Sequence, residues 1–480
     1  MGARWGHCPW RPRPEHDRAT APLTYAPTLA FTAPPCEPIP VTTTSTPPLS
    51  AQLPNAASCL HAVLQGRSLT DALASLAPAD RPAAQALAFH ALRHHGLSRA
   101  LVARVAPRAP APAVQALLEV AVSLLVADDG PRYAAHTVVD QAVAAARARR
   151  ATAGAAGFLN ACLRRLLREG NALRASLADD PVAQHGHPRW WIDRVRADHP
   201  DGWAEMLAAS RVPAPMTLRV NRRRAARADW QARLRAAEGV DSRAWGEDGV
   251  VLDRPLPVER LPGFAAGEVS VQDAAAQHAA SLLLAGRDWG PGDRVLDACA
   301  APGGKSAHLL ERADIDLLSL DIDDARCRRV AETFARLGLP GTVRCADAAR
   351  PDTWWDGRPF DAILLDAPCT ASGIVRRHPD VPWLRREADV AALVTTQRAL
   401  LDALWPLLRP GGRLLYATCS VFRAEGADQA AAFLERHTDA RERPCLGHLR
   451  PGSGAAADQV NDNPPGGYDG FFYARFDKAP

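Results

Sequence analysis

The chain has 480 residues, of which 47% are hydrophobic and 23% are charged, as in an ordinary folded protein long enough for several domains. Its net charge of +4 is compatible with a nucleic-acid partner but does not demonstrate one. The ten cysteines form no CxxC pair, so their spacing indicates neither a metal site nor a disulfide framework. We therefore expect a cytoplasmic protein. The first 20 residues lack the apolar stretch typical of a secretory signal, so we expect none, and no apolar run is long and unbroken enough to suggest a membrane-spanning helix.

The N-terminal third changes character near residue 50. Residues 1–50 hold 11 of the 41 prolines, and such a composition buries too little apolar surface to order itself. We expect a disordered tail there. In residues 51–185 apolar side chains recur at helical spacing, as at Leu60, Val63 and Leu64, without strand-like alternation. This pattern predicts an all-α bundle.

The last two predicted helices of this bundle carry clusters of arginine. The clusters are Arg147, Arg149 and Arg150, and then Arg164, Arg165 and Arg168. Two interpretations fit them: solvated helix faces, or a surface that binds RNA phosphates.

Two further modules are expected downstream. Residues 186–268 combine a helix near Trp190–Arg196, an extended run at Met216–Asn221 and a helix near Asp229–Glu238, which predicts a small α+β module for linking or RNA binding. Residues 269–480 alternate apolar strands with helices, which predicts a doubly wound, Rossmann-like α/β domain. Its expected strands are Arg294–Ala298, Ile315–Asp321, Thr342–Ala346, Phe360–Asp366, Arg413–Thr418 and Gly470–Phe476.

The first of these strands runs into a loop of small residues, Cys299–Lys305, which then opens a helix. The loop is neither a Walker A motif nor GxGxxG, so it does not indicate a phosphate cradle. Acidic residues stand at or just after the ends of the next strands, at Asp321, Asp347 and Asp366. Carboxylates at such positions accept hydrogen bonds from ribose hydroxyls or flank an adenine. The set favours a nucleoside cofactor without a pyrophosphate, namely S-adenosylmethionine.

A cysteine follows each of the next two strands, at Cys369 and Cys419. A thiolate that adds to C6 of a pyrimidine turns C5 into a nucleophile for a methyl group, and a second group must then assist release of the product. Lys305 is one of only two lysines among 57 basic residues, and its loop is expected beside the strand that ends at Asp366.

With these residues the chain resembles the RNA cytosine-C5 methyltransferase family, above all its bacterial branch that acts on small-subunit ribosomal RNA. The resemblance covers about residues 55–480 and includes an N-terminal NusB-like RNA-binding domain. The matching motifs are Cys299–Lys305, Asp321–Asp323, Asp366–Thr370, Arg376–Asp380, Ala417–Ser420 and Asp469–Ala474.

The resemblance implies a role for each part of the site. Cys419 would attack C6, Cys369 would assist product release, and Asp366 and Lys305 would complete the catalytic set. The S-adenosylmethionine site would be lined by Cys299, Ala300, Ala301, Pro302, Gly303, Gly304, Lys305, Asp321, Asp347 and Asp366. The expected partner is small-subunit ribosomal RNA, bound by a monomer without a metal ion. DNA cytosine methyltransferases use a Pro-Cys nucleophile, which would select Cys369, whereas the Thr-Cys context of Cys419 favours the RNA arrangement.

Several alternatives remain open. The substrate could be transfer RNA or another ribosomal site, or the chain could be a non-catalytic RNA-binding or ribosome assembly factor. The basic residues after Cys369 fit either contacts to flanking RNA phosphates or ordinary solvated side chains. They are Arg376, Arg377, His378, Arg385 and Arg386.

Overall fold

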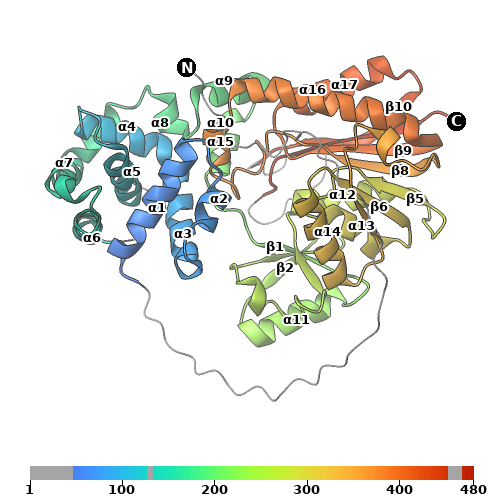
Figure 1. Cartoon of the computed structure of the whole chain (residues 1–480), viewed down its shortest axis with the longest axis horizontal. Coiled ribbons are helices and arrows are strands. Elements are labelled where there is room, and N and C mark those ends of the chain that lie inside the picture. The colour runs from blue at the N-terminus through green and yellow to red at the C-terminus, as the bar shows by residue number, and fades with distance from the viewer. Residues whose placement is uncertain (1–46, 127–132, 452–466) are drawn as a thin grey trace, which may run out of the picture.

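The protein is described from a computed structural model that covers residues 47–126, 133–451 and 467–480 (Figure 1). The tail expected at residues 1–50 therefore lies outside the described residues, except for its last four. There the first helix already begins, at Leu49. Within the described ranges, no helix combines the length and the apolar composition needed to cross a bilayer.

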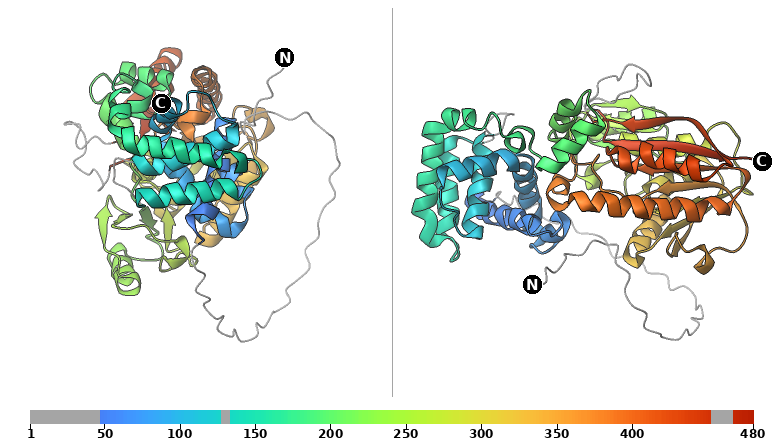
Figure 2. Two further views of the ribbon diagram at one scale, coloured as in Figure 1. Left: turned by 90° about the vertical axis from the view of Figure 1, so that its left-hand side faces the viewer. Right: turned by 90° about the horizontal axis from the view of Figure 1, so that it is seen from above.

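The N-terminal region is a helical bundle around one apolar core, which confirms the predicted all-α domain (Figure 2). Its helices are α1 (Leu49–Leu64), α2 (Leu69–Ala74), α3 (Arg81–Arg93), α4 (His95–Val105), α5 (Pro112–Val126), α6 (Ala135–Arg147), α7 (Ala156–Ala175) and α8 (Pro181–His185). The residues of α5 are apolar on nearly every side of the helix and most of them are buried, as expected of a helix in the middle of a core. Asp180 caps the start of α8, and Gly186 ends it with a left-handed φ of 69°.

Three helices and a small antiparallel sheet connect the bundle to the rest of the chain. They are α9 (Arg189–Asp198), α10 (Trp203–Ser210), β1 (Thr217–Val220), α11 (Arg227–Glu238), β2 (Ser242–Trp245), β3 (Gly249–Leu252) and β4 (Val269–Val271). The strand order is β2-β3-β1-β4. Trp230 of α11 is fully buried against Leu218 and Val250 of the sheet. The predicted α+β module is thus present, with more strands than the single extended run suggested.

The C-terminal module contains a seven-stranded sheet in the order β10-β11-β9-β8-β5-β6-β7. Its strands are β5 (Arg294–Asp297), β6 (Asp316–Asp321), β7 (Thr342–Cys345), β8 (Phe360–Asp366), β9 (Leu408–Thr418), β10 (Ala440–Leu449) and β11 (Phe471–Lys478). The strands from β9 to β7 are parallel, and β10 and β11 are antiparallel. Because β6 lies on one side of β5 and β8 on the other, the chain order reverses at β5. In such sheets, ligands bind beyond the strand ends at this reversal.

Helices cover both faces of this sheet (Figure 1). Val295 and Leu364 point to one face, whereas Leu296 and Leu365 point to the other, as the alternation of strand side chains requires. The first face packs against α12 (Ala274–Leu284), α13 (Gly304–Arg312) and α14 (Asp324–Leu337), and the second against α16 (Glu387–Leu404) and α17 (Ala427–Arg436). This layering confirms the predicted Rossmann-like domain.

The bundle contacts the C-terminal module through the segment that follows Cys369. The backbone N–H of Leu69 donates to the carboxylate of Asp380 across 2.9 Å, and the indole N–H of Trp383 in α15 (Val381–Leu384) donates to the carbonyl of Leu92. The Trp383 ring also meets the His95 ring edge to face. The helical domain is therefore attached directly to a loop of the candidate site.

Candidate active site

The loop that follows β5 approaches the neighbouring elements closely. The N–H of Ala300 donates to the carbonyl of Leu320 at 2.7 Å, and that of Ala301 donates to the carboxylate of Asp321 at 3.3 Å. Gly303 has a φ of 95°, and a Cβ there would lie 3.2 Å from the backbone of Val330 in α14. Only glycine therefore suits this turn.

A buried hydrogen bond between a hydroxyl and a carboxyl group joins the two ends of this loop. The hydroxyl of Ser306 donates to the carboxyl group of Asp297 at 2.5 Å, and neither side chain is exposed. Burial raises the pKa of Asp297 to about 7. The pair ties the end of β5 to the first turn of α13, and so fixes where the loop leaves the sheet.

The three acidic residues predicted to hold a cofactor lie at the same edge of the sheet. Asp321 and Asp366 end β6 and β8, and Asp347 lies two residues beyond β7. Asp321 is 3% exposed, accepts the N–H of Asp323 and has the guanidinium of Arg326 at 3.4 Å. The structure thus brings the predicted loop and acids together.

These residues fit S-adenosylmethionine by their chemistry. The loop side chains are small, and its one basic residue, Lys305, is already paired with Asp366. No cation of the loop is therefore left to hold a pyrophosphate. The carboxylates of Asp321 and Asp347 can accept hydrogen bonds from hydroxyl or amino groups of a nucleoside. In the described ranges, no cluster of His, Cys, Asp and Glu is suited to a metal ion.

The two cysteines meet beyond the ends of β8 and β9. These strands are parallel neighbours in which Asp366 stands opposite Ala417, and the Sγ atoms of Cys369 and Cys419 are 3.3 Å apart. The hydrogen bond to Cys419, together with burial, raises the pKa of the Cys369 thiol well above its usual range. Cys369 therefore keeps its proton and can donate its S–H to a thiolate at Cys419.

Lys305 links the Cys299–Lys305 loop to these cysteines. Its Nζ donates to Oδ2 of Asp366 at 2.6 Å and lies 5.1 Å from the centre of the Phe471 ring. Burial alone would lower the pKa of Lys305, but the negative charge and hydrogen bond of Asp366, with a contribution from Cys419, raise it. Lys305 therefore stays an ammonium ion within electrostatic reach of Cys419.

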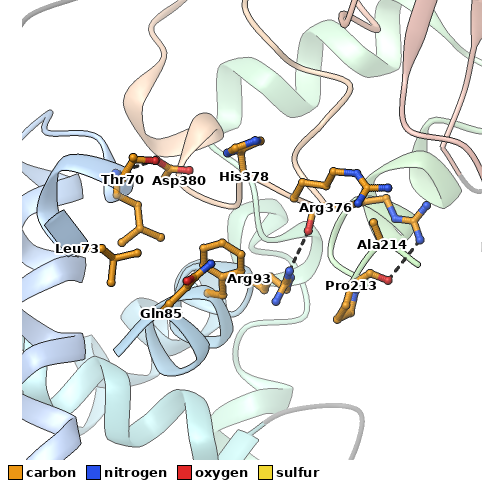
Figure 3. A pocket seen from close by; sticks show the side chains of 12 residues that line it. Thr70, Leu73, Gln85, Arg93, Pro213, Ala214, Arg376, His378 and Asp380 are labelled. Atoms are coloured by element: carbon orange, nitrogen blue, oxygen red, sulfur yellow. Dashed lines mark hydrogen bonds between the residues drawn. The ribbon is translucent and has the colours of Figure 1, made fainter. Parts of the chain in front are cut away.

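The first arginine after Cys369 is buried and hydrogen-bonded within the protein. Arg376 is 3% exposed, and its guanidinium donates to the carbonyls of Val212, Pro213, Gly467 and Tyr468. Both interpretations of Arg376, as a contact to RNA phosphate and as an ordinary solvated side chain, are therefore wrong. Its backbone carbonyl accepts from Arg93 of the helical domain at the edge of a cavity of about 410 Å³ (Figure 3).

Arg377 and Arg385 are also held by contacts within the protein. Arg377 forms ion pairs with Asp273 at 2.7 Å and with Asp469 at 2.6 Å, and Arg385 donates to the carbonyl of Thr370. Asp469 lies in a motif that matched the family, but sequence alone gave no reason to pair it and Asp273 with one arginine. Burial raises the pKa of Asp469 to about 7, with the nearby Asp273 adding to the effect.

Comparison with known proteins follows the same division of the chain. Residues 54–168 match the NusB family, residues 187–259 the ferredoxin-like domain of RsmF/B-like methyltransferases, and residues 285–477 the 16S rRNA methyltransferase RsmB/F family. The ribosomal RNA small subunit methyltransferase B of Pseudomonas syringae pv. tomato is 42% identical over 438 residues, which cover 88% of this chain and 96% of that protein. The chain belongs to the ribosomal RNA small subunit methyltransferase B family. Its member from Xanthomonas campestris pv. campestris is 43% identical over 441 residues, with the same coverage.

Solved structures show the same fold. PH0851 covers 91% of this chain and all of its own, with a TM-score of 0.69 and 22% identity. A methyltransferase homologue from Pyrococcus horikoshii covers 62% of this chain and 98% of its own, with a TM-score of 0.52 and 26% identity. Membership of the small subunit methyltransferase B family confirms the resemblance seen in the sequence and the assignment as a methyltransferase.

Proposed function

We propose that this enzyme transfers a methyl group from S-adenosylmethionine to C5 of a cytosine in small-subunit ribosomal RNA, through a covalent bond between Cys419 and C6. The observation that carries the proposal is the 3.3 Å contact between the sulfurs of Cys419 and Cys369, next to the Lys305–Asp366 pair. Family membership supports the substrate class. The described cysteines are free thiols, as in the cytoplasm where we expect the enzyme to act.

Asp366 would recognise the base. It is 27% exposed, and its Oδ2 is held by Lys305. A carboxylate accepts a hydrogen bond from the exocyclic amine of cytosine. Uracil carries a carbonyl oxygen at that position, which a carboxylate repels. Asp366 would therefore orient cytosine and exclude uracil.

The covalent step uses the Cys419 thiolate, which the Lys305 ammonium and the Cys369 thiol stabilise. A bond forms between Sγ of Cys419 and C6, and the electron pair of the C5–C6 double bond becomes available at C5. S-adenosylmethionine, when bound, supplies an electrophilic methyl group for that carbon. The C5 proton is then lost to solvent and the C6–S bond breaks, which restores the aromatic ring. The S–H of Cys369 stabilises the departing Cys419 thiolate.

The helical domain would hold the RNA around the target. Arg147, Arg149 and Arg150 at the end of α6 are exposed, as are Arg164 and Arg168 on α7. The helices α6 and α7 lie side by side on the outer side of the bundle (Figure 2). Arg165 is partly engaged, because it pairs with Glu169. A paired set of exposed arginines suits the phosphate backbone of RNA.

The test is methylation of defined RNA by the purified enzyme. Small-subunit ribosomal RNA that lacks the modification and a transfer RNA pool are each incubated with S-adenosylmethionine, and 5-methylcytosine is mapped by bisulfite sequencing. We expect one cytosine in the small-subunit RNA to become protected, and no protection with Cys419→Ala. Protection in transfer RNA alone would reassign the substrate. RNA binding without any protected cytosine, in ribosomal particles as well as in naked RNA, would favour an assembly factor and contradict the proposal.

A further inference from the structure

A buried carboxylate outside the matching family motifs connects the two cysteine loops. Glu425 ends the short 3-10 helix Arg423–Glu425, six residues after Cys419, and its side chain is fully buried. No part of the proposed reaction uses it. A carboxylate is rarely buried without a partner of opposite charge, so its surroundings call for an explanation.

Four hydrogen-bond donors converge on this carboxylate. Oε1 accepts the backbone N–H of Thr370 at 2.9 Å and the side-chain amide of Gln397 at 3.2 Å. Oε2 accepts the hydroxyl of Thr370 at 2.5 Å and that of Ser420 at 2.6 Å. Thr370 directly follows Cys369, and Ser420 directly follows Cys419. One carboxylate therefore bridges the residues next to both cysteines.

The backbone of Glu425 is fixed as well. Its carbonyl accepts the phenol of Tyr416 at 2.7 Å and the hydroxyl of Thr418 at 3.3 Å, both from the end of β9. Gln397 of α16 also donates to the carbonyl of Pro368, just before Cys369. Glu425 thus contacts the end of β9 through its backbone carbonyl and both cysteine loops through its carboxylate.

We propose that Glu425 is a positioning residue that holds the Cys369 and Cys419 loops together, so that the two sulfurs stay in contact during methyl transfer. The catalytic consequence rests on the proposed function, whereas the geometric coupling does not. Burial raises the pKa of Glu425 against the lowering effect of its hydrogen bonds. We expect the length of the Glu425 side chain to matter more than its charge, because no cation is among the hydrogen-bond partners of the carboxylate.

A positioning role predicts different effects for Glu425→Gln and Glu425→Ala. In Glu425→Gln the amide oxygen can accept from Thr370 N–H and Gln397, and the amide NH₂ can donate to the hydroxyl oxygens of Thr370 and Ser420, which both donate and accept. The link between the loops is then kept. In Glu425→Ala all four donors lose their acceptor and nothing joins the loops. Glu425→Asp keeps the charge but is one methylene too short to reach both loops.

The first readout is oxidation of the cysteine pair by diamide, which does not depend on methyl transfer. Two thiols give a disulfide and two protons, and the two electrons reduce the N=N bond of diamide. The Cys369–Cys419 disulfide is quantified by mass spectrometry of the joined peptides. We expect the rate to fall by about tenfold or more in Glu425→Ala and in Glu425→Asp, and to stay within about twofold of wild type in Glu425→Gln.

The matched control is Glu119→Ala in the helical domain. Glu119 is as buried as Glu425 and lies 3.1 Å from His95, far along the chain from the cysteines. It should lower the melting temperature without slowing oxidation of the cysteine pair. If Glu425→Ala does not fold, Glu425→Asp carries the test.

The second readout is kinetic. We expect kcat for methyl transfer to follow the oxidation rate across the Glu425 variants, while KM for RNA stays within about twofold. An unchanged oxidation rate in both the Ala and the Asp variant would overturn the positioning role, as would equal slowing in Glu119→Ala. If wild-type enzyme methylates no cytosine but the oxidation rates still separate as described, the proposed reaction fails and the coupling stands.

Discussion

The ammonium of Lys305 and the carboxylate of Asp366 are joined by a 2.6 Å hydrogen bond that connects the Cys299–Lys305 loop to the end of β8. Lys305 is 12% exposed and Asp366 27%, so the pair is largely shielded from water but still open on one side. The compact ammonium fits between the carboxylate and the Phe471 ring. Its charge therefore sits where a bound base, a methyl donor and the Cys419 thiolate would meet.

Replacement of Lys305 by arginine keeps the charge but should impair catalysis. A planar guanidinium is larger and directs its donors differently, so the short bond to Asp366 would be lost or displaced. The loss of one charge-assisted hydrogen bond corresponds to about 1.5–3 kcal/mol, or roughly a 10- to 150-fold fall in kcat/KM.

The matched control is Lys478→Arg, at the only other lysine. Lys478 lies at the end of β11 and donates to the carbonyls of Trp405 and Leu408. Arginine can make both bonds, so this variant should stay active. A fully active Lys305→Arg enzyme would remove Lys305 from the catalytic set.

The exposed arginines of α7 should contribute to RNA affinity but not to chemistry. Arg164 and Arg168 are one helical turn apart and both exposed. The double variant Arg164→Glu, Arg168→Glu should raise KM for RNA with little change in kcat, and should lower the dependence of log K on log salt by about 1.5, since each phosphate contact contributes about 0.7–0.9. Filter binding at several salt concentrations measures this slope. Arg328→Glu on α14 is the control, at an arginine 68% exposed. Equal slopes in all three proteins would identify the face as merely solvated.

Acidification should destabilise the protein through His187. This ring is fully buried, and burial lowers its pKa from 6.5 to about 4. Between these values the unfolded chain binds a proton that the folded chain does not, so stability present above pH 6.5 is lost as the pH falls. The cost of lowering the pH from 7 to 5 is about 2 kcal/mol for this one group. Urea unfolding at both pH values should show a smaller difference in His187→Gln than in wild type or in His136→Gln, a substitution at an exposed histidine. An identical pH dependence in all three would contradict the assignment.

Sequence periodicity predicted the layers because they depend on local patterns. The strands leading to Asp321, Asp366 and Cys419 are apolar and end at turn residues, and the predicted ends agree with the structure. The strand β10 was missed because it lies at the edge of the sheet and its first half, near Arg441–Arg443, is exposed and charged. The sequence of such a segment is typical of a loop.

The remainder of the site depends on contacts that no local pattern encodes. Arg376 is buried because carbonyls more than 160 residues earlier in the chain converge on its guanidinium. Glu425 follows the Cys419 motif closely, and its position six residues after a candidate nucleophile was the one available signal. Its connection to Thr370 crosses 55 residues and depends on β8 and β9 being neighbours.

The most direct test of the account is covalent trapping on RNA that contains 5-fluorocytosine. Fluorine at C5 cannot leave as a proton does, so an enzyme that attacks C6 and transfers the methyl group stays bound to the RNA and migrates as an adduct on a denaturing gel. We predict an adduct with wild type and with Cys369→Ala, and none with Cys419→Ala. An adduct with Cys419→Ala and none with Cys369→Ala would contradict the account and make Cys369 the nucleophile.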